Sequence, residues 1–540
     1  MAILVSGLVA VIIFYLIILA VGLWAAWKKR KSGGEDKRNE RPMVGARDIG
    51  LIVGSFTLTA TWVGGGYING IAEYVYTPGY GLVWTTSPFS ACLTLLIIGK
   101  FFVKRMKNQG FTTMLDPMQY KYGRWMGVLL FLPALLGDLC WSASILAALA
   151  GTLSVIIDLS YSISVIFSAC IAVSYTLVGG LYSVAYTDIV QLSFVFVGLW
   201  LAIPFAFTHP AVTSITTTAF EAPTWLGTWD WQAVGYWVDG FLLVAVGGLP
   251  WQSVYQRILA TASATKAEVV SYIAGFATLA MAVPSILFGA IAASTDWNAT
   301  DYDSAGKTPL DKNEQVLILP IILRYLTPTA VAVIGLGALA AAVMSSIDSA
   351  ILSSSSQFTR NVYNFGFRHN ATRRELQWVM RLATVSFTVA AAALALTVHS
   401  VYILWFLCVD LVYVALVPQF VCALFLDPNT YGSLPAYVIG IILRVGGGEP
   451  AFNMDPFIHY PGGLNFPFKT FAMVVSFITL VVFSYAAKYL FEKGIIPEKY
   501  DIFQCKLARG GRTLTLEEII GNDVVYENVK LEIIQQKVQL

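Results

Sequence analysis

The sequence predicts an all-α integral membrane protein with thirteen transmembrane helices. Hydrophobic residues make up 57% of its 540 residues and charged residues only 12%, against about 25% in a typical soluble domain. Because so few charged side chains cannot cover a water-exposed surface, most of the chain must face lipid. The net charge of +2 provides no basic excess for binding nucleic acid. No nucleophile–base pair and no cofactor motif indicates catalysis, so we expect no enzymatic activity.

The thirteen helices follow from runs of apolar residues, since a helix needs about 20 of them to cross the hydrocarbon core. Such runs lie at residues 2–27, 49–72, 82–103, 126–157, 162–181, 184–206, 232–256, 268–294, 328–356, 376–398, 401–426, 432–445 and 469–490. The first run has no small-residue cleavage site, so we expect a membrane anchor there and not a signal peptide.

Basic residues set the expected orientation, because Lys and Arg collect in cytoplasmic loops. A basic cluster follows the first run and places the N-terminus outside: Lys28, Lys29, Arg30, Lys31, Lys37, Arg38 and Arg41. Alternation along the chain then puts the C-terminus inside and the loop 295–327 outside. This loop contains the sequence Asn298-Ala299-Thr300, so we expect N-glycosylation of Asn298.

Two of the runs contain glycines near their middle, at Gly64–Gly66 and at Gly247–Pro250. Consecutive glycines favour unwinding, and a proline has no backbone N–H to donate to the helix. Unpaired backbone is unfavourable in lipid, so an interrupted helix persists where it lines a cavity or binds something. Close helix packing explains either glycine run alone equally well. The matched pair, in the second and seventh helices, favours the midplane site of a secondary transporter.

The two interruptions stand five helices apart, which predicts two inverted repeats formed by helices 2–6 and 7–11. An odd number of helices in each repeat inverts the second copy relative to the first. The expected organisation is a first helix with a basic cytoplasmic loop at 1–48, repeat 1 at 49–206, repeat 2 at 232–426 with the extracellular loop 295–327, two peripheral helices at 427–490, and a cytoplasmic tail at 491–540.

Oxygen atoms near the first interruption predict a sodium site. A small cation takes about five or six oxygens, and an unwound helix supplies free carbonyls. The carbonyls of Thr59 and Trp62 lie three residues apart where the second helix breaks. The ninth helix offers the carbonyl of Ala342 and the hydroxyls of Ser345 and Ser346. The alternative is that these serines bond back to their own helix, as single membrane serines usually do.

Five carboxylates also fall inside the apolar runs: Asp138, Asp188, Asp239, Asp348 and Asp410. Each costs roughly 2.5–3.5 kcal/mol at the middle of a bilayer, so each is by default a candidate functional residue. Some of them will serve only as hydrogen-bond acceptors between helices.

Tryptophans near the interruptions indicate the class of substrate. Of the 15 tryptophans, Trp62 and Trp251 adjoin the interruptions, and Trp141 lies near the centre of the fourth helix. Indole faces attract a cation that has no protons to donate, by about 0.5–2 kcal/mol each. Core packing explains any one of the three, but together they favour an aromatic box for a small organic cation such as a quaternary ammonium. A sugar would need several Gln, Asn or Glu side chains on these helices, which show few.

Longer strings of residues resemble a known family. Tyr175–Ser183, continuing to Tyr186–Asp188, resembles the signature of the sodium:solute symporter family. Further strings resemble the choline-transporting branch of that family: Thr59–Gly70, Thr77–Gly81, Gly247–Gln252, Met344–Ser349, Gly447–Pro450 and Phe466–Thr470. The similarity runs from the first helix to about residue 495.

This resemblance implies a leucine-transporter-like core within thirteen helices and an N-terminus outside. It implies sodium- and chloride-dependent uptake of choline across the plasma membrane of presynaptic cholinergic terminals, where it supplies acetylcholine synthesis, and it suggests synaptic vesicles as a second location. Inhibition by hemicholinium-type bis-quaternary compounds is also implied. Na+ and Cl− are co-transported in this interpretation, and no cofactor is required.

The resemblance assigns roles residue by residue. The family's shared sodium site falls on Thr59, Trp62, Ala342, Ser345 and Ser346, and the aromatic box falls on Trp62, Trp141 and Trp251. Asp188 matches a family carboxylate linked to a second sodium, and Asp348 is a further candidate for this coupling. Ala91 stands where family members carry an aromatic residue, which leaves the fourth wall of the box open.

Two alternatives remain on the sequence alone. The first is a sodium symporter for another small solute, such as an amino acid, a sugar or a vitamin. The second is a sensor that binds its ligand without transporting it. No signalling domain follows the predicted helices, which disfavours the second alternative.

Overall fold

The computed structural model describes residues 7–9, 12–14, 16–18, 20–22, 24, 49–157, 159–178, 181–220, 225–302, 310–368, 371–398 and 400–503, with the backbone alone at residues 175–178, 181–183, 312–313, 344–345, 348, 464 and 498. In these parts of the chain the structure is helical, and its β-structure is limited to isolated bridges. The prediction of an all-α protein is therefore confirmed for the described residues.

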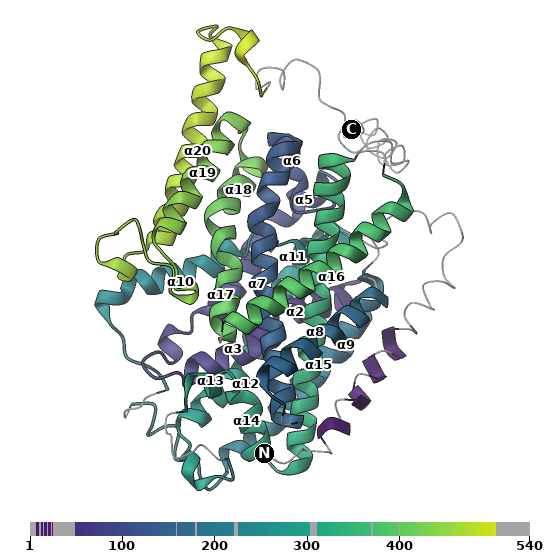
Figure 1. The fold of residues 1–540 in the computed structure, drawn as a ribbon, viewed down its shortest axis with the longest axis vertical. Coiled ribbons are helices and arrows are strands. Elements are labelled where there is room, and N and C mark those ends of the chain that lie inside the picture. Colours follow the sequence, from purple (N-terminus) through teal and green to yellow (C-terminus); the bar gives the residue numbers. More distant parts are fainter. Residues whose placement is uncertain are drawn as a thin grey trace.

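The helices follow one another along a single bundle (Figure 1). The main ones are α2 (Leu51–Trp62), α3 (Gly65–Tyr76), α4 (Ser87–Ile97), α5 (Val103–Asn108), α6 (Asp116–Tyr122), α7 (Arg124–Ile157), α8 (Tyr161–Val178), α9 (Leu181–Phe207), α10 (Val234–Gly247), α11 (Gln252–Ala260), α12 (Ala264–Ala293), α14 (Ile318–Tyr325), α15 (Thr329–Gln357), α16 (Arg373–Thr397), α17 (Val401–Leu411), α18 (Val417–Phe425), α19 (Thr430–Gly446) and α20 (Phe468–Glu492). Three π-helical segments extend α4, α15 and α17: Ile98–Phe102, Phe358–Phe367 and Val412–Leu416.

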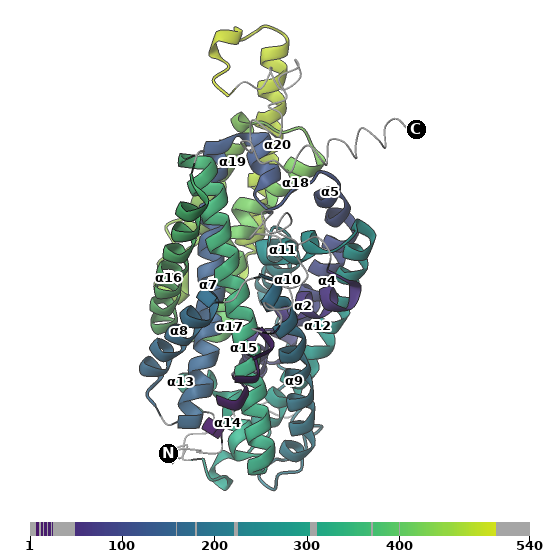
Figure 2. The ribbon, with the colours of Figure 1, turned by 90° about the vertical axis from the view of Figure 1, so that its right-hand side faces the viewer.

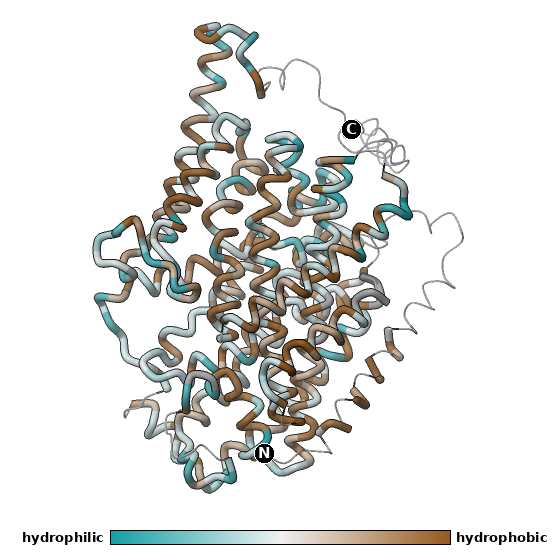
Figure 3. Tube along the Cα trace, in the orientation of Figure 1, coloured by the Kyte–Doolittle hydropathy of each residue, from teal (hydrophilic) through white to brown (hydrophobic). Residues whose placement is uncertain are grey.

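Every apolar run predicted from the second to the thirteenth coincides with one of these helices or with consecutive ones. Within the described residues, eight helices are long and apolar enough to cross a membrane, or nine when the bent pair α2 and α3 counts as one span. Figure 3 shows apolar residues along the helices and polar residues at the loops and helix ends. The count of thirteen spans and the orientation stay predictions.

Burial divides the helices into an inner and an outer group. In Figure 2, α16 lies at the edge of the bundle. The most apolar part of α7 is 89% buried, and α7 packs against α15, α16 and α17. The corresponding parts of α16 and α20 are only 28% and 22% buried, so their apolar side chains face outward, as expected for lipid contact. The inner helices α2, α3, α7, α15 and α17 enclose the site described next.

Candidate functional site

Both predicted interruptions are present. α2 ends at Trp62 and α3 begins at Gly65, and the two helices are bent by 49° relative to each other. α10 ends at Gly247 and α11 begins at Gln252, with Trp251 between them in an extended conformation. The peptide groups at each interruption leave the regular helical pattern, which frees carbonyls for other partners.

The two interruptions meet inside the bundle. A Cβ atom added at Gly248 would lie 3.0 Å from the indole ring of Trp62, so the glycine allows the two segments to approach. The carbonyl of Val244 at the end of α10 accepts a hydrogen bond of 2.9 Å from the hydroxyl of Thr94 on α4. This carbonyl also accepts the backbone N–H of Gly248 at 3.1 Å, so the hydroxyl of Thr94 adds a second hydrogen bond that ties α4 to the end of α10.

The glycines of the first interruption also serve close packing. A Cβ atom at Gly64 would lie 2.0 Å from the hydroxyl oxygen of Ser346, and one at Gly65 would lie 2.3 Å from Val343. Real Cβ contacts are never so short, so only glycine fits where α15 crosses the break. The packing explanation and the binding-site explanation thus apply to the same residues.

A cavity of about 320 Å³ lies between the interruptions, counted as all space not filled by atoms. Its lining is mainly aromatic, and it comprises Thr61, Trp62, Trp141, Trp251, Trp405, Cys408 and Val409. The rings of Trp141 and Trp251 stand edge to face, with their centroids 5.5 Å apart. The three tryptophans predicted from the sequence therefore share one cavity.

Trp405 supplies a fourth aromatic wall that the sequence did not single out. It lies on α17 and is 4% exposed, and its ring packs against Tyr67 and Phe406, with centroid distances of 5.9 and 5.6 Å. Ala91 is fully buried and does not line the cavity. The available signal was the spacing of Trp405, Cys408 and Val409, which places all three on one face of a helix.

Residues of the predicted sodium site meet where α15 crosses the α2–α3 break. The hydroxyl of Ser346 lies 3.4 Å from the carbonyl oxygen of Ala60 and 3.3 Å from that of Ala342. Ser346 is fully buried. Ala60 was not predicted, although its position in the last turn of α2, just before the break, could have suggested it. The side chain of Ser345 lies outside the described residues.

Thr59 points its polar groups along its own helix. Its hydroxyl donates to the carbonyl of Ser55 at 2.7 Å, and its carbonyl accepts from the N–H of Val63 at 2.8 Å. A carbonyl oxygen has two lone pairs, so this bond leaves one for a cation. The hydroxyl of Thr59 is therefore engaged, and any role in cation binding would fall to its carbonyl.

Asp188 belongs to a buried network that includes an arginine missed in the sequence analysis. The carboxylate accepts a hydrogen bond from Thr57 on α2 and lies 4.0 Å from a guanidinium nitrogen of Arg257 on α11. Arg257 also donates to Ser349 on α15. Both charged side chains are about 1% exposed, so each reduces the burial penalty of the other. The side chain of Asp348 lies outside the described residues.

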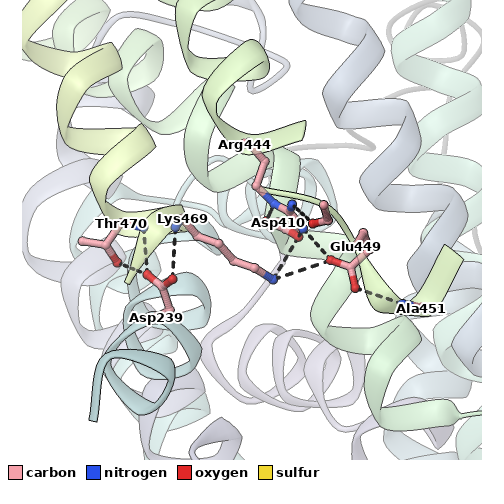
Figure 4. Close-up of polar contacts among 8 residues, drawn as sticks. Asp239, Asp410, Arg444, Glu449, Ala451, Lys469 and Thr470 are labelled. Carbon is pink, nitrogen blue, oxygen red and sulfur yellow. Dashed lines mark hydrogen bonds and ion pairs between the residues drawn. The ribbon is translucent and has the colours of Figure 1, made fainter. Parts of the chain in front are cut away.

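The carboxylate of Asp239 is held by hydrogen bonds from the beginning of α20 (Figure 4). Its carboxylate accepts the backbone N–H groups of Lys469 and Thr470, at 3.0 and 2.8 Å, and the hydroxyl of Thr470. These N–H groups belong to the first turn of α20 and have no partner within that helix. Asp239 thus ties α10 to the beginning of α20, as a hydrogen-bond acceptor between helices.

Asp410 is paired with two basic residues in the same region (Figure 4). Arg444 on α19 binds it with two guanidinium nitrogens, and the ammonium of Lys469 lies 3.1 Å away. Arg444 also contacts Glu449 at 2.5 Å. The side chains of Asp410 and Arg444 are 4% and 5% exposed, so this cluster joins α17, α19 and α20 as a buried ion pair.

The predicted glycosylation site is accessible. Asn298 is exposed and lies in a short 3₁₀ helix, Trp297–Ala299, that follows α12. The neighbouring Trp297 is fully buried and anchors this turn to the protein.

A sequence model of the sodium:solute symporter family matches residues 43–440. The chain belongs to the sodium:solute symporter family. The matched region includes both interruptions, the four tryptophans of the cavity and the α15 residues beside the first break.

The chain is also similar to several curated proteins over most of its length. It is 52% identical to the human high affinity choline transporter 1, covering 98% of this chain and 93% of the human protein. The Torpedo marmorata high-affinity choline transporter 1 is 51% identical, covering 96% and 92% of the two chains. The Drosophila melanogaster protein of the same name is 48% identical, covering 93% and 81%.

Solved structures show the same fold in more distant proteins. A Na+-coupled sialic acid symporter in a substrate-bound outward-open state superposes with a TM-score of 0.71, covering 90% of this chain and 97% of that one at 17% identity. At this identity the similarity concerns the fold alone. The two proteins therefore share their arrangement of helices.

Proposed function

We propose that this protein carries choline into the cell, coupled to sodium and driven by alternating access of one central site to the two sides of the membrane. The cavity lined by four tryptophans, between two interrupted helices, is the observation that supports this function most directly. The relatives named high-affinity choline transporter, at about half identity over nearly the whole chain, support the same substrate.

The chemistry of the cavity suits a trimethylammonium group. Such a group has no N–H to donate, and it gains about 0.5–2 kcal/mol from each indole face when water is excluded. The hydroxyl of Thr61, the one hydroxyl among the described lining residues, already donates to the carbonyl of Thr57 at 2.7 Å. A sugar or an amino acid would find few partners for its several polar groups, which disfavours the rival symporters.

The rings must move apart to admit choline, since the 320 Å³ includes the gaps between packed side chains. The interruptions allow this movement, because the two halves of each broken helix are joined by a few non-helical residues. In this proposal Trp62, Trp141, Trp251 and Trp405 form the box that closes around the cation.

Sodium would bind where α15 crosses the first break. The proposed ligands are the carbonyls of Thr59, Trp62 and Ala342 and the hydroxyls of Ser345 and Ser346. The position of Ser346, between the carbonyls of Ala60 and Ala342, supports this site. Sodium bound there would bridge α2 and α15 and favour the conformation in which the bridge is intact, which couples the ion to the movement.

The membrane potential and the sodium gradient supply the free energy that concentrates choline inside the cell. Each positive charge that enters gains about 2.3 kcal/mol per 100 mV of membrane potential, and a tenfold sodium gradient adds about 1.4 kcal/mol. Co-transported chloride would offset one charge. A second sodium ion is proposed to bind at Asp188, together with Asp348. One carboxylate oxygen of Asp188 has no hydrogen bond within the described residues and could contact the ion.

The remaining parts of the proposal concern the cell. In this proposal the protein lies in the plasma membrane of presynaptic terminals, with synaptic vesicles as a proposed second location, and supplies choline for acetylcholine synthesis. Hemicholinium-type bis-quaternary compounds are expected to inhibit it, because each carries cations of the same class as the substrate. Asn298 is proposed to carry a glycan on the outer surface.

Uptake measurements with ion replacement test this function. Cells that express the full chain should accumulate labelled choline in sodium chloride medium and lose most of this uptake when sodium is replaced by N-methylglucamine. Excess unlabelled proline or glucose should not compete. Uptake that persists without sodium, or equal competition by glucose or proline, would contradict the proposal.

A further inference from the structure

A second cavity adjoins the tryptophan cavity. It has about 180 Å³ of space not filled by atoms, and it is lined by Met114, Ala134, Asp138, Pro250, Trp251, Gln252, Gln357 and Val412. Trp251 lines both cavities, so the two cavities share it as a wall. The second cavity contains no residue of the predicted sodium site and is distinct from it.

The second cavity lies on one particular side of the first. Along α7, Asp138 is about one turn closer than Trp141 to the helix start at Arg124. Met114 precedes α6, which lies at the same end of the bundle as the beginning of α7. The sequence-based orientation places this end in the cytoplasm, so the second cavity stands between the tryptophan cavity and the cell interior.

Oxygen acceptors dominate the polar lining of this cavity. The carboxylate of Asp138 is 4% exposed and accepts one hydrogen bond, from the hydroxyl of Ser354 at 2.6 Å. Gln357 is fully buried, and its amide oxygen has no hydrogen-bond partner in the described part of the chain. The amide oxygen of Gln252 accepts from the N–H of Met114 and from Gln357.

Asp138 has no basic partner in the part of the chain that the structure describes. None of the lining residues is basic, and no Lys or Arg among the described residues lies within ion-pair distance of its carboxylate. The other buried aspartates of the spanning helices that the structure describes all have basic or backbone N–H partners. A buried carboxylate without a counter-ion is unfavourable, and a bound cation removes this penalty.

We propose that the second cavity is an inner binding site for an organic cation, occupied by choline after it passes Trp251 and before it enters the cytoplasm. This inference rests on the proposed transport of choline. The trimethylammonium group would lie between the carboxylate of Asp138 and the indole of Trp251. The hydroxyl group of choline would donate a hydrogen bond to the side-chain amide oxygen of Gln357, which has no partner among the described residues.

The walls of this cavity belong to segments that can change shape. Val412 begins one π-helical segment, and Gln357 directly precedes another, Phe358–Phe367. Pro250 and Trp251 form the non-helical connection between α10 and α11. π-Helical turns inside α-helices are uncommon and often occur at functional sites, so we expect the cavity to widen at these segments when choline enters.

Equilibrium binding to the purified full-length protein in nanodiscs tests the inner site. With saturating sodium, labelled choline should bind at two sites per chain, one of them weaker. Asp138→Asn should weaken the second site at least tenfold and leave the affinity of the first within twofold. Asp138→Glu, which keeps the charge, should retain both sites. The control Ser354→Ala removes the hydrogen bond to Asp138 but not the charge, and it should also retain both.

Several outcomes would overturn the inference. Binding of one choline per chain to the unmodified protein would do so, as would two unchanged sites in Asp138→Asn. An equal loss of the second site in Ser354→Ala would show that Asp138 is a structural acceptor. A change in the half-saturating sodium concentration of Asp138→Asn, with choline binding unchanged, would show a sodium site.

Binding of tetramethylammonium distinguishes a failure of the inner site from a failure of the proposed choline transport. If choline is not bound at all but tetramethylammonium binds in a manner that depends on Asp138, the inner cation site stands and choline is the wrong substrate. If neither compound binds, both proposals fail. Influx measurements add an independent readout, because Asp138→Asn should lower the maximal rate about tenfold with little change in KM.

Discussion

Replacement of Trp405 by leucine tests the aromatic box at the wall that the sequence did not indicate. Trp405→Leu removes one indole from the cavity and leaves an apolar side chain of smaller size on α17. The other three tryptophans come from α2, α7 and the α10–α11 connection, so they do not depend on this position. The change therefore isolates the contribution of one ring.

The expected magnitude follows from the burial of the ring. A cation–π contact is worth about 0.5–1 kcal/mol at exposed sites and about 2 kcal/mol or more when water is excluded. Trp405 is 4% exposed, so the upper value applies. At 1.4 kcal/mol for each factor of ten, the KM for choline should rise about 30-fold. The maximal rate per transporter should change less, because choline that is bound can still be carried.

The assay is the initial rate of choline uptake at several concentrations, normalised to the amount of protein at the cell surface. Trp405→Phe keeps an aromatic face and should raise KM less than leucine does. Trp378→Leu is the matched control, since Trp378 lies on α16, is 68% exposed and does not line the cavity. A KM within twofold of the unmodified protein in Trp405→Leu, at normal surface expression, would refute the box.

Three further predictions concern sodium, stability and orientation. Ser346→Ala removes the hydroxyl between the carbonyls of Ala60 and Ala342. The half-saturating sodium concentration for choline uptake should rise at least tenfold, and an unchanged value would exclude Ser346 as a sodium ligand. Arg444→Met leaves Asp410 with Lys469 alone. The free energy of unfolding should fall by about 3–5 kcal/mol, seen as a lower thermal midpoint in detergent. An unchanged midpoint would contradict a stabilising role of the Asp410–Arg444 ion pair. Asn298→Gln should abolish a glycosidase-sensitive shift in gel mobility, and the absence of any such shift in the unmodified protein would contradict an external loop.

The sequence predicted those features that leave a local mark. Hydrophobic runs marked the helices, and glycine or proline marked the two interruptions, because backbone that leaves the helical pattern needs those residue types. Trp62 and Trp251 were identified because they stand beside these marks. Trp141 followed from its place near the middle of a long apolar run, where an interfacial role does not apply.

Trp405 and Arg257 escaped prediction because their roles arise from contacts between distant segments. Trp405 is surrounded in sequence by ordinary apolar residues, and it joins the cavity only because α17 packs against α7 and α3. Arg257 lies at the end of a predicted apolar run, where a basic residue is common, and its partner Asp188 is almost 70 residues away. Hydrogen-bond partners of this kind depend on tertiary packing, which local patterns do not encode.

The two halves of the seventh predicted span are held by different groups of helices. α10 is tied to α20 through Asp239, and α20 is in turn joined to α17 and α19 through Asp410. α11 is tied instead to α9 and α15 through the contacts of Arg257 with Asp188 and Ser349. The break between these halves contains Trp251, the residue that lines both cavities. A movement of one group of helices relative to the other would therefore bend the chain at this break and turn the ring of Trp251, which links opening of the cavity to a rearrangement of the whole bundle.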